Sequence, residues 1–144
     1  RAAALDRFAA ALEAGLAQGS DARERARAIG DAYVRFATEH PAAYQLMSEI
    51  SQVDESRYPE LVRASRRARE TMVGYVRDMI REGMMDGDAD LIGYMFWSTL
   101  HGIVVLDMAG RLGGEIDADT LRKKTMRTLL AGMAVSPPRR DDES

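Results

Sequence analysis

Residues 91 to 108 are the segment that most constrains the fold, because their apolar side chains cannot be confined to one helix face. A helix turns by about 100° per residue, and at that angle the large apolar residues here surround the whole circumference. They are Leu91, Ile92, Tyr94, Met95, Phe96, Trp97, Leu100, Ile103, Val104, Val105, Leu106 and Met108. A helix that is apolar on all sides must be covered on all sides. A small domain rarely supplies that cover alone, so the segment predicts contact with a second copy of the chain.

The rest of the chain predicts helices as well, so the expected fold class is all-α with six helices. Apolar residues recur at steps of three and four, whereas the apolar–polar alternation of strands does not occur. The expected helices cover about 2 to 17, 21 to 40, a short stretch after Pro41, 59 to 82, 88 or 90 to 109, and 117 to 135.

Polar and proline residues mark where these helices begin and end. Asp21 with Glu24 three residues later is typical of a capping box, in which side chains satisfy free backbone N–H groups. Pro41 ends one helix and suits the first position of the next, so we expect a sharp turn at His40. The short helix that follows is expected to carry Tyr44, Leu46, Met47 and Ile50.

The segment from 117 to 135 carries two apolar arcs, one of them rich in small residues. Two adjacent helices buried on more than one side are what a four-helix dimer interface requires. We read Gly102 as a point of close packing, because glycine costs stability inside a helix. Which arc faces the partner stays open. The expected interface residues are Met95, Thr99, Gly102, Leu106, Leu121, Thr125, Thr128, Leu129 and Gly132.

Composition excludes several classes of function. The 144 residues fit one domain, and the net charge of −3 provides no large basic surface for nucleic acid. Cysteine is absent and the two histidines lie far apart, so we expect no metal, no cofactor and no disulfide. Arginines on the 59 to 82 helix alternate with acids, as on a solvated face. No nucleophile–base pair, paired carboxylates or phosphate loop indicates an enzyme. No export signal or membrane span is expected, so the sequence predicts a cytoplasmic protein.

Two stretches resemble the TetR family of transcriptional regulators, in the subgroup with a Trp-x-x-x-His-Gly element. Residues 33 to 47 read YVRFATEHPAAYQLM, similar to the family's aromatic helix end, proline and Tyr-x-Leu-Met turn. Residues 97 to 106 read WSTLHGIVVL. Ser48 departs from the pattern, since an aromatic residue often stands there. The resemblance spans about residues 1 to 135 and corresponds to the C-terminal half of such regulators.

The resemblance implies a ligand-binding and dimerisation domain over residues 1 to 135. It implies a homodimer through the last two helices, a cavity for an effector in each subunit, and contact with DNA only through an N-terminal helix-turn-helix domain absent from this chain. Residues 136 to 144 are expected to form a disordered tail. The implied function is that of a repressor released from DNA by a small lipophilic molecule. Neither the effector, nor the operator, nor the sign of regulation follows from the sequence.

The expected ligand-binding residues converge between the second and fifth helices. Each is also what an ordinary core would contain, because ligand pockets are themselves mostly apolar and aromatic. Trp97 and His101 lie one turn apart on the same helix face, so their side chains can line the same cavity. The alternative function is a helical homodimeric interaction module without a ligand, which a core without a cavity would favour. The ligand-binding residues expected are Tyr33, Phe36, Tyr44, Met47, Met72, Val76, Met79, Trp97 and His101.

Overall fold

The computed structural model describes residues 1–50 and 53–133, and within them every regular element is a helix. Its elements are α1 (Ala2–Leu16), α2 (Ala22–Glu39), α3 (Pro41–Ser48), η1 (Glu55–Arg57), α4 (Pro59–Arg81), α5 (Ala89–Met108) and α6 (Ala118–Met133). The predicted all-α class is confirmed, with a short 3₁₀ turn, η1, added between the third and fourth helices. The expected tail at 136 to 144 and the expected helix end at Val135 lie outside the described residues.

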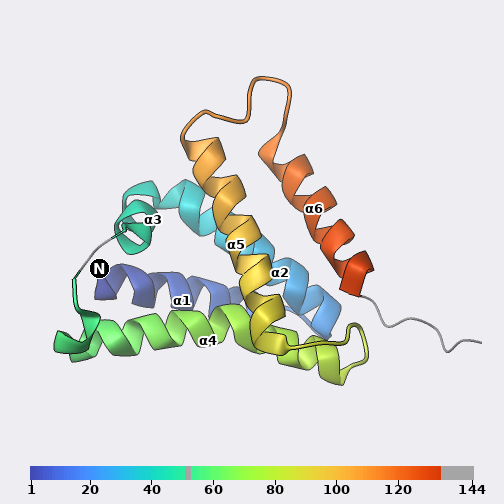
Figure 1. Ribbon diagram of the computed structural model, residues 1–144, viewed down its shortest axis with the longest axis horizontal. Helices are drawn as coiled ribbons and strands as arrows, with labels where there is room; N and C mark the ends of the chain where they lie inside the picture. The colour runs from blue at the N-terminus through green and yellow to red at the C-terminus, as the bar shows by residue number, and fades with distance from the viewer. Residues whose placement is uncertain (51–52, 134–144) are drawn as a thin grey trace, which may run out of the picture.

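The helices form a lower layer with a helical hairpin standing on it. Figure 1 shows α1 and α4 side by side, α2 crossing behind α5, and α5 rising steeply from the lower layer before the chain returns through α6. α1 contacts α2, α3 and α4, and α5 contacts α2, α4 and α6. α5 is therefore the element that joins the lower layer to α6.

Aromatic and methionine side chains fill the space inside the lower layer. Phe8 is fully buried and packs edge-on against Tyr33 and Phe36, with ring centroids 5.2 Å and 5.4 Å apart. Met72 and Val76 close this core from α4 and are also fully buried. The apolar stripe predicted for the 59 to 82 helix is confirmed, because its members Leu61, Ala68, Met72, Tyr75, Val76 and Met79 are all buried.

Most predicted helix boundaries are confirmed by the hydrogen bonds that cap them. Asp21 accepts from the backbone N–H of Glu24 at 2.8 Å, although Glu24 reaches back to Ser20 and so does not complete a capping box. Asp88, rather than Asp90, caps α5, and Asp117 accepts from the N–H of Thr120 at the start of α6. These carboxylates satisfy backbone donors that a helix start leaves free.

One predicted position was wrong. Ile50 was expected on the short third helix, but α3 ends at Ser48 and Glu49 is extended with ψ 129°. The side chain of Ile50 is consequently 99% exposed. The backbone leaves the helical conformation at Glu49, so Ile50 lies beyond the helix that packs against α1 and α2.

The arginines of α4 are solvated, as predicted, and several of them pair with acids. Arg67 donates to Glu13 at 2.8 Å and to Asp6 at 3.2 Å, which ties α4 to α1. Arg77 pairs with Glu70 and Asp90 at 3.2 Å. Exposed pairs of this kind contribute little stability each, about 0 to 1 kcal/mol.

Close helix contacts occur at glycines other than those expected. A Cβ on Gly93 would lie 3.0 Å from Val73, so α4 and α5 approach each other at this residue. Gly102 and Gly132 have open space where a Cβ would stand, so neither marks close packing within the chain. Any close contact at these two residues would have to come from another molecule.

The connection between α4 and α5 has one fully buried side chain, Met85, which attaches it to the core. Met85 is 1% exposed, while Gly83 and Gly87 on either side adopt φ values of +76° and +136°. Glycine reaches such angles without steric cost. The two glycines therefore let the chain turn inward to bury Met85 and then outward again into α5.

Candidate functional site

A chain of hydrogen bonds links three elements inside the aromatic core. The hydroxyl oxygens of Tyr33 on α2 and Tyr44 on α3 lie 2.6 Å apart, and Tyr44 Oη lies 2.7 Å from Nδ1 of His101 on α5. The two tyrosine rings also pack edge-on with centroids 5.8 Å apart. Three of the predicted ligand-binding residues are thus in direct contact.

The turn at Pro41 accounts for this arrangement. Proline begins α3 immediately after His40, so the chain reverses and returns Tyr44 toward the buried face of α2. His101 reaches the same place from the middle of α5, where Leu100 and Val104 bury the neighbouring helix face. Helices far apart in sequence therefore place hydrogen-bonding groups at one location.

Burial determines the protonation of this chain. It raises the pKa of Tyr44 to about 12 and that of Tyr33 further, so both phenols stay protonated. Burial also lowers the pKa of His101 below its usual 6.5, because the charged imidazolium is poorly solvated there. At neutral pH the three groups form a neutral network.

Three further predicted residues lie on the same helices as this network. Trp97, one turn before His101, is partly exposed, stacks on Tyr94 with centroids 5.7 Å apart, and its side chain interacts with Tyr33. Phe36 is buried and packs against the imidazole of His40. Met47 on α3 is also buried.

The predicted residues of α4 belong to the core around this network. Met72 and Val76 are fully buried and Met79 is 1% exposed. Sequence reasoning left Phe8, Tyr75 and Phe96 of the same core out of the expected site, and it noted Ser48 only as a departure from the family pattern. Tyr75 and Phe96 stack with centroids 6.4 Å apart, and Ser48 interacts with the hydroxyl of Tyr44. The apolar periodicity of α1 and α4 contains Phe8 and Tyr75, but nothing in it distinguishes these two from other core residues.

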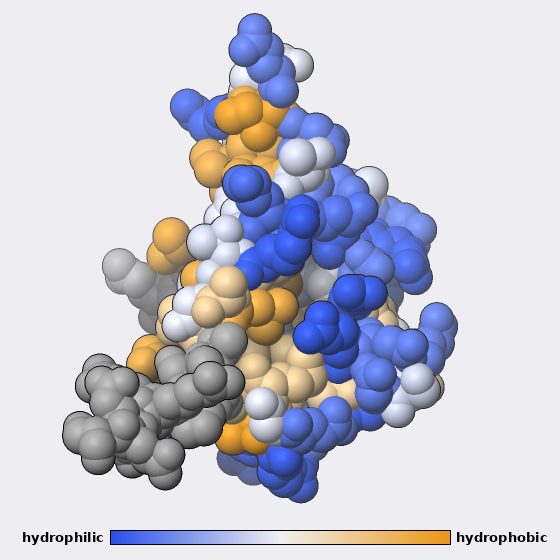
Figure 2. Space-filling model, turned by 90° about the vertical axis from the view of Figure 1, so that its right-hand side faces the viewer, coloured by the Kyte–Doolittle hydropathy of each residue, from blue (hydrophilic) through white to orange (hydrophobic). Residues whose placement is uncertain are grey.

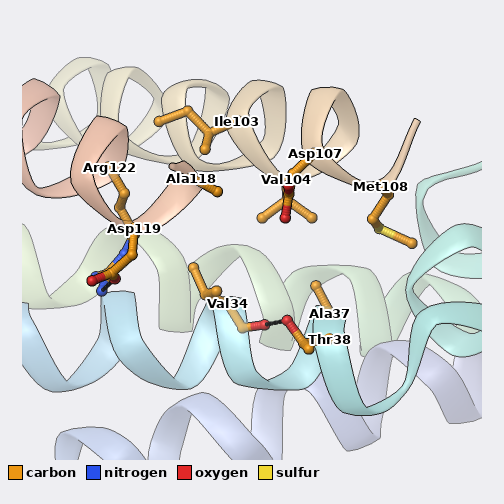
Figure 3. A pocket seen from close by; sticks show the side chains of 10 residues that line it. All are labelled: Val34, Ala37, Thr38, Ile103, Val104, Asp107, Met108, Ala118, Asp119 and Arg122. Carbon is orange, nitrogen blue, oxygen red and sulfur yellow. Dashed lines mark hydrogen bonds and ion pairs between the residues drawn. The ribbon is translucent and has the colours of Figure 1, made fainter. Parts of the chain in front are cut away.

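A small cleft of about 40 Å³ lies elsewhere, between α2, α5 and α6 (Figure 3). Its walls include Val34, Val104 and Met108, and Arg122 points from α6 toward α2 at one end. Arg122 is 9% exposed and donates to Asp31 and Asp119 at 2.8 Å each. Ligand sites usually measure about 300 to 1,000 Å³. None of the predicted ligand-binding residues lines this cleft.

The residues expected at a dimer interface lie on the outer surfaces of α5 and α6. Gly102, Leu106, Thr128 and Gly132 are exposed, and Met95, Thr99, Leu121, Thr125 and Leu129 are half-buried. Leu121, Thr125 and Thr128 also line an open groove of about 570 Å³. On the α6 side, Figure 2 shows hydrophobic side chains gathered at the upper end and recurring in patches below it.

α5 remains strongly apolar outside the part that the chain buries. By length and composition alone it could cross a membrane, with a mean hydropathy of 1.3, yet only 33% of that window is buried. Val105 and Leu106 are each 43% exposed and Met108 is 37% exposed. In residues 1–50 and 53–133, no three His, Asp or Glu side chains gather as a metal site would need.

The fold and site together define an all-α regulatory-type domain, a helical bundle with a small polar network inside an aromatic core. A model of the tetracyclin repressor-like C-terminal domain matches residues 26–129, and the chain belongs to this family. Domains of the family generally sense effectors and dimerise, and they are regulatory rather than enzymatic.

A solved structure is similar over most of the chain. It is a protein with unknown function from Rhodococcus sp. RHA1, with a TM-score of 0.77 and 27% identity. The match covers 93% of this chain and 69% of that chain. No curated protein matches the chain.

Proposed function

We propose that this chain senses a small lipophilic effector in its aromatic core, forms a homodimer through α5 and α6, and so controls a TetR-like repressor that leaves DNA when the effector binds. The observation that carries the proposal is that α5 contributes both to the hydrogen-bonded core and to the exposed apolar surface. One part of this helix brings His101 to the tyrosines of α2 and α3, and another exposes Val105 and Leu106. A change at the core can therefore reach the outer surface through one rigid element.

A second copy of the chain is the cover that best suits the exposed part of α5. The apolar residues there continue onto α6, where Leu129 and Leu130 are only partly buried. Pairing two such hairpins would form a four-helix interface with contacts typical of a stable dimer. A membrane suits this surface less well, because Asp107 lies next to Leu106 and the adjoining α6 carries Lys123 and Lys124. Regulators of this family are typically soluble and cytoplasmic, and we assign this chain to the same compartment.

Effector binding would act by shifting a population between two states. A ligand moves such an equilibrium only by its difference in affinity for the two states. Entry of a molecule beside Trp97 and His101 would displace α5 relative to α2 and α3. Because α5 also forms the proposed interface, the two subunits would reorient, and the DNA-reading domains of such a regulator would lose their spacing.

One observation favours the alternative function, a dimeric interaction module without a ligand. The predicted pocket residues on α4 are fully buried, and the small cleft and the open groove are both lined by other side chains. Under this alternative, Tyr33, Tyr44 and His101 serve only to join α2, α3 and α5. The two functions differ in whether a small molecule binds near Trp97.

The test uses the fluorescence of Trp97, the single tryptophan. A set of lipophilic compounds is screened for a change in emission together with a rise in melting temperature. A true effector at a hundredfold excess over its dissociation constant should stabilise the folded chain by about 2.7 kcal/mol. Phe36→Asn and Met72→Gln should abolish the response, while the surface variant Arg66→Gln should retain it. If no compound produces both changes and the chain is dimeric, the interaction module is the better description.

A further inference from the structure

The hydroxyl of Tyr33 sets the direction of the hydrogen-bond chain. This side chain is fully buried, and a buried O–H without an acceptor is costly. Its neighbours in the described part of the chain are Tyr44 Oη at 2.6 Å and the side chain of Trp97. The indole of Trp97 has an N–H group and no acceptor. The Tyr33 proton is therefore donated to the oxygen of Tyr44.

The oxygen of Tyr44 is then fully used as an acceptor. It accepts a hydrogen bond from the Tyr33 hydroxyl. The Ser48 side chain also hydrogen-bonds to it and lowers the pKa of Tyr44, as a donor does. The remaining hydrogen-bonding group near it is Nδ1 of His101, 2.7 Å away. The Tyr44 hydroxyl therefore donates to Nδ1, and Nδ1 carries no proton.

The proton of the neutral imidazole consequently lies on Nε2. Burial keeps the pKa of His101 below 6.5, so the ring carries a single proton at neutral pH. Within residues 1–50 and 53–133, the recorded hydrogen bond of the ring is made by Nδ1, and the side chain is only partly buried. The chain of hydrogen bonds thus ends in the Nε2–H group of a side chain that is only partly buried.

We propose that the Nε2–H group of His101 selects the effector, so that the site accepts lipophilic molecules bearing an acceptor oxygen, such as a ketone or ester, over ammonium ions, which can only donate. This inference rests on the effector-sensing function proposed above and specifies its ligand class. An ammonium group would face a donor at Nε2 and lose its hydration without compensation. A carbonyl oxygen accepts a hydrogen bond from Nε2–H and so extends the chain of hydrogen bonds without any proton transfer.

The first experiment determines the tautomer without any effector. Two-bond ¹H–¹⁵N correlation spectra of the ¹⁵N-labelled chain distinguish Nε2–H from Nδ1–H, and His40→Gln assigns the signals of the two histidines. We expect His101 in the Nε2–H form at neutral pH, and a mixture of forms in Tyr44→Phe. A proton on Nδ1 of the unaltered chain would overturn the proposal.

The second experiment compares three molecules that share one skeleton. Ethylbenzene has no polar group, acetophenone adds an acceptor oxygen, and α-methylbenzylammonium carries donors only. We expect acetophenone to bind roughly two- to tenfold more tightly than ethylbenzene, the range of one net neutral hydrogen bond. The ammonium should bind more weakly than ethylbenzene, as followed by melting temperature and by shifts of the His101 resonances.

Matched variants decide which residue is responsible. His101→Phe should remove the difference between acetophenone and ethylbenzene, whereas His40→Phe should preserve it, because His40 contacts Arg7 and lies outside the chain of hydrogen bonds. Equal binding of acetophenone and ethylbenzene to the unaltered chain would overturn the selection. Binding of none of the three, with the Nε2–H form intact, would overturn sensing in this core and with it the selecting role of His101.

Discussion

Arg122 of α6 donates to Asp31 of α2 across 2.8 Å, and it is the single buried residue that α6 has in the part of the chain described. The side chain of Arg122 is 11% exposed, whereas the side chains of Asp31 and Asp119 are more than half exposed. The charge that depends most on its partners is therefore the arginine. A helix attached to the bundle mainly by partly buried apolar residues is fixed at this end by an ion pair.

The two carboxylates should matter more to α6 than the arginine does. In the double variant Asp31→Asn with Asp119→Asn, Arg122 is left buried without a negative partner, at a cost of about 3 kcal/mol. Arg122→Met should cost less, because both freed carboxylates reach water. Hydrogen exchange of α6 amides, with exposed Arg127→Met as control, measures the difference. Greater loss of protection in Arg122→Met than in the double variant would contradict this order.

Gly93 and Gly102 should respond in opposite ways to alanine. A Cβ on Gly93 meets Val73, including its backbone, at 3.0 Å, so Gly93→Ala should destabilise the fold by about 1 to 2 kcal/mol. Gly102 has open space around it, so Gly102→Ala should stabilise the isolated subunit by about 0.5 to 1 kcal/mol. Urea unfolding at low protein concentration measures both. If Gly102 contacts a partner, sedimentation at higher concentration should show a weaker dimer for Gly102→Ala.

A charge at Thr128 should weaken the proposed dimer without unfolding the subunit. Thr128 is exposed, and its hydroxyl donates only to the Lys124 carbonyl of its own helix. Thr128→Glu would place an unpaired charge in the interface, which typically costs several kcal/mol when water is excluded. Sedimentation at micromolar concentration checks this, with Arg63→Glu on α4 as the control. If the unaltered chain sediments as a monomer, the proposed interface does not form.

Acid should destabilise the fold through His101 before the carboxylates titrate. Because burial lowers the pKa of His101 from 6.5 in the folded state, the unfolded chain binds this proton more readily just below pH 6.5. The free energy of unfolding is therefore at its plateau above pH 6.5 and falls as the pH drops toward the folded pKa. His101→Gln should flatten this part of the curve and leave the loss from Glu13 and Asp119 at lower pH unchanged. If the unaltered chain and His101→Gln have the same dependence of unfolding free energy on pH above pH 5, the loss of stability does not come from His101.

Local signals in the sequence were sufficient for the helices and their ends. Asp21, Asp117 and Pro41 act within a few residues of themselves, so their effect can be predicted without knowledge of the fold. Ile50 was misplaced because apolar spacing alone does not reveal where a short helix runs out of neighbours.

The site depended on contacts that no local pattern contains. His101, Tyr33 and Tyr44 were expected together, yet their order in a chain of hydrogen bonds follows from the crossing of α2, α3 and α5. Arg122 was not singled out in the sequence, and its burial arises from its approach to Gly30 and Asp31. The dimer residues stay predictions, since their partner surface lies outside one subunit.

The buried Met85 gives the two connections of α5 unequal tolerance to engineering. An insertion between Arg81 and Asp88 would pull this side chain from the core, whereas residues 109–117 are exposed apart from half-buried Leu112. A peptide tag, a protease site or a fluorescent protein can therefore be inserted near Gly113, whereas the same insertion near Gly83 would unfold the domain. The α5–α6 loop is thus the suitable insertion site for converting this domain into a genetically encoded reporter.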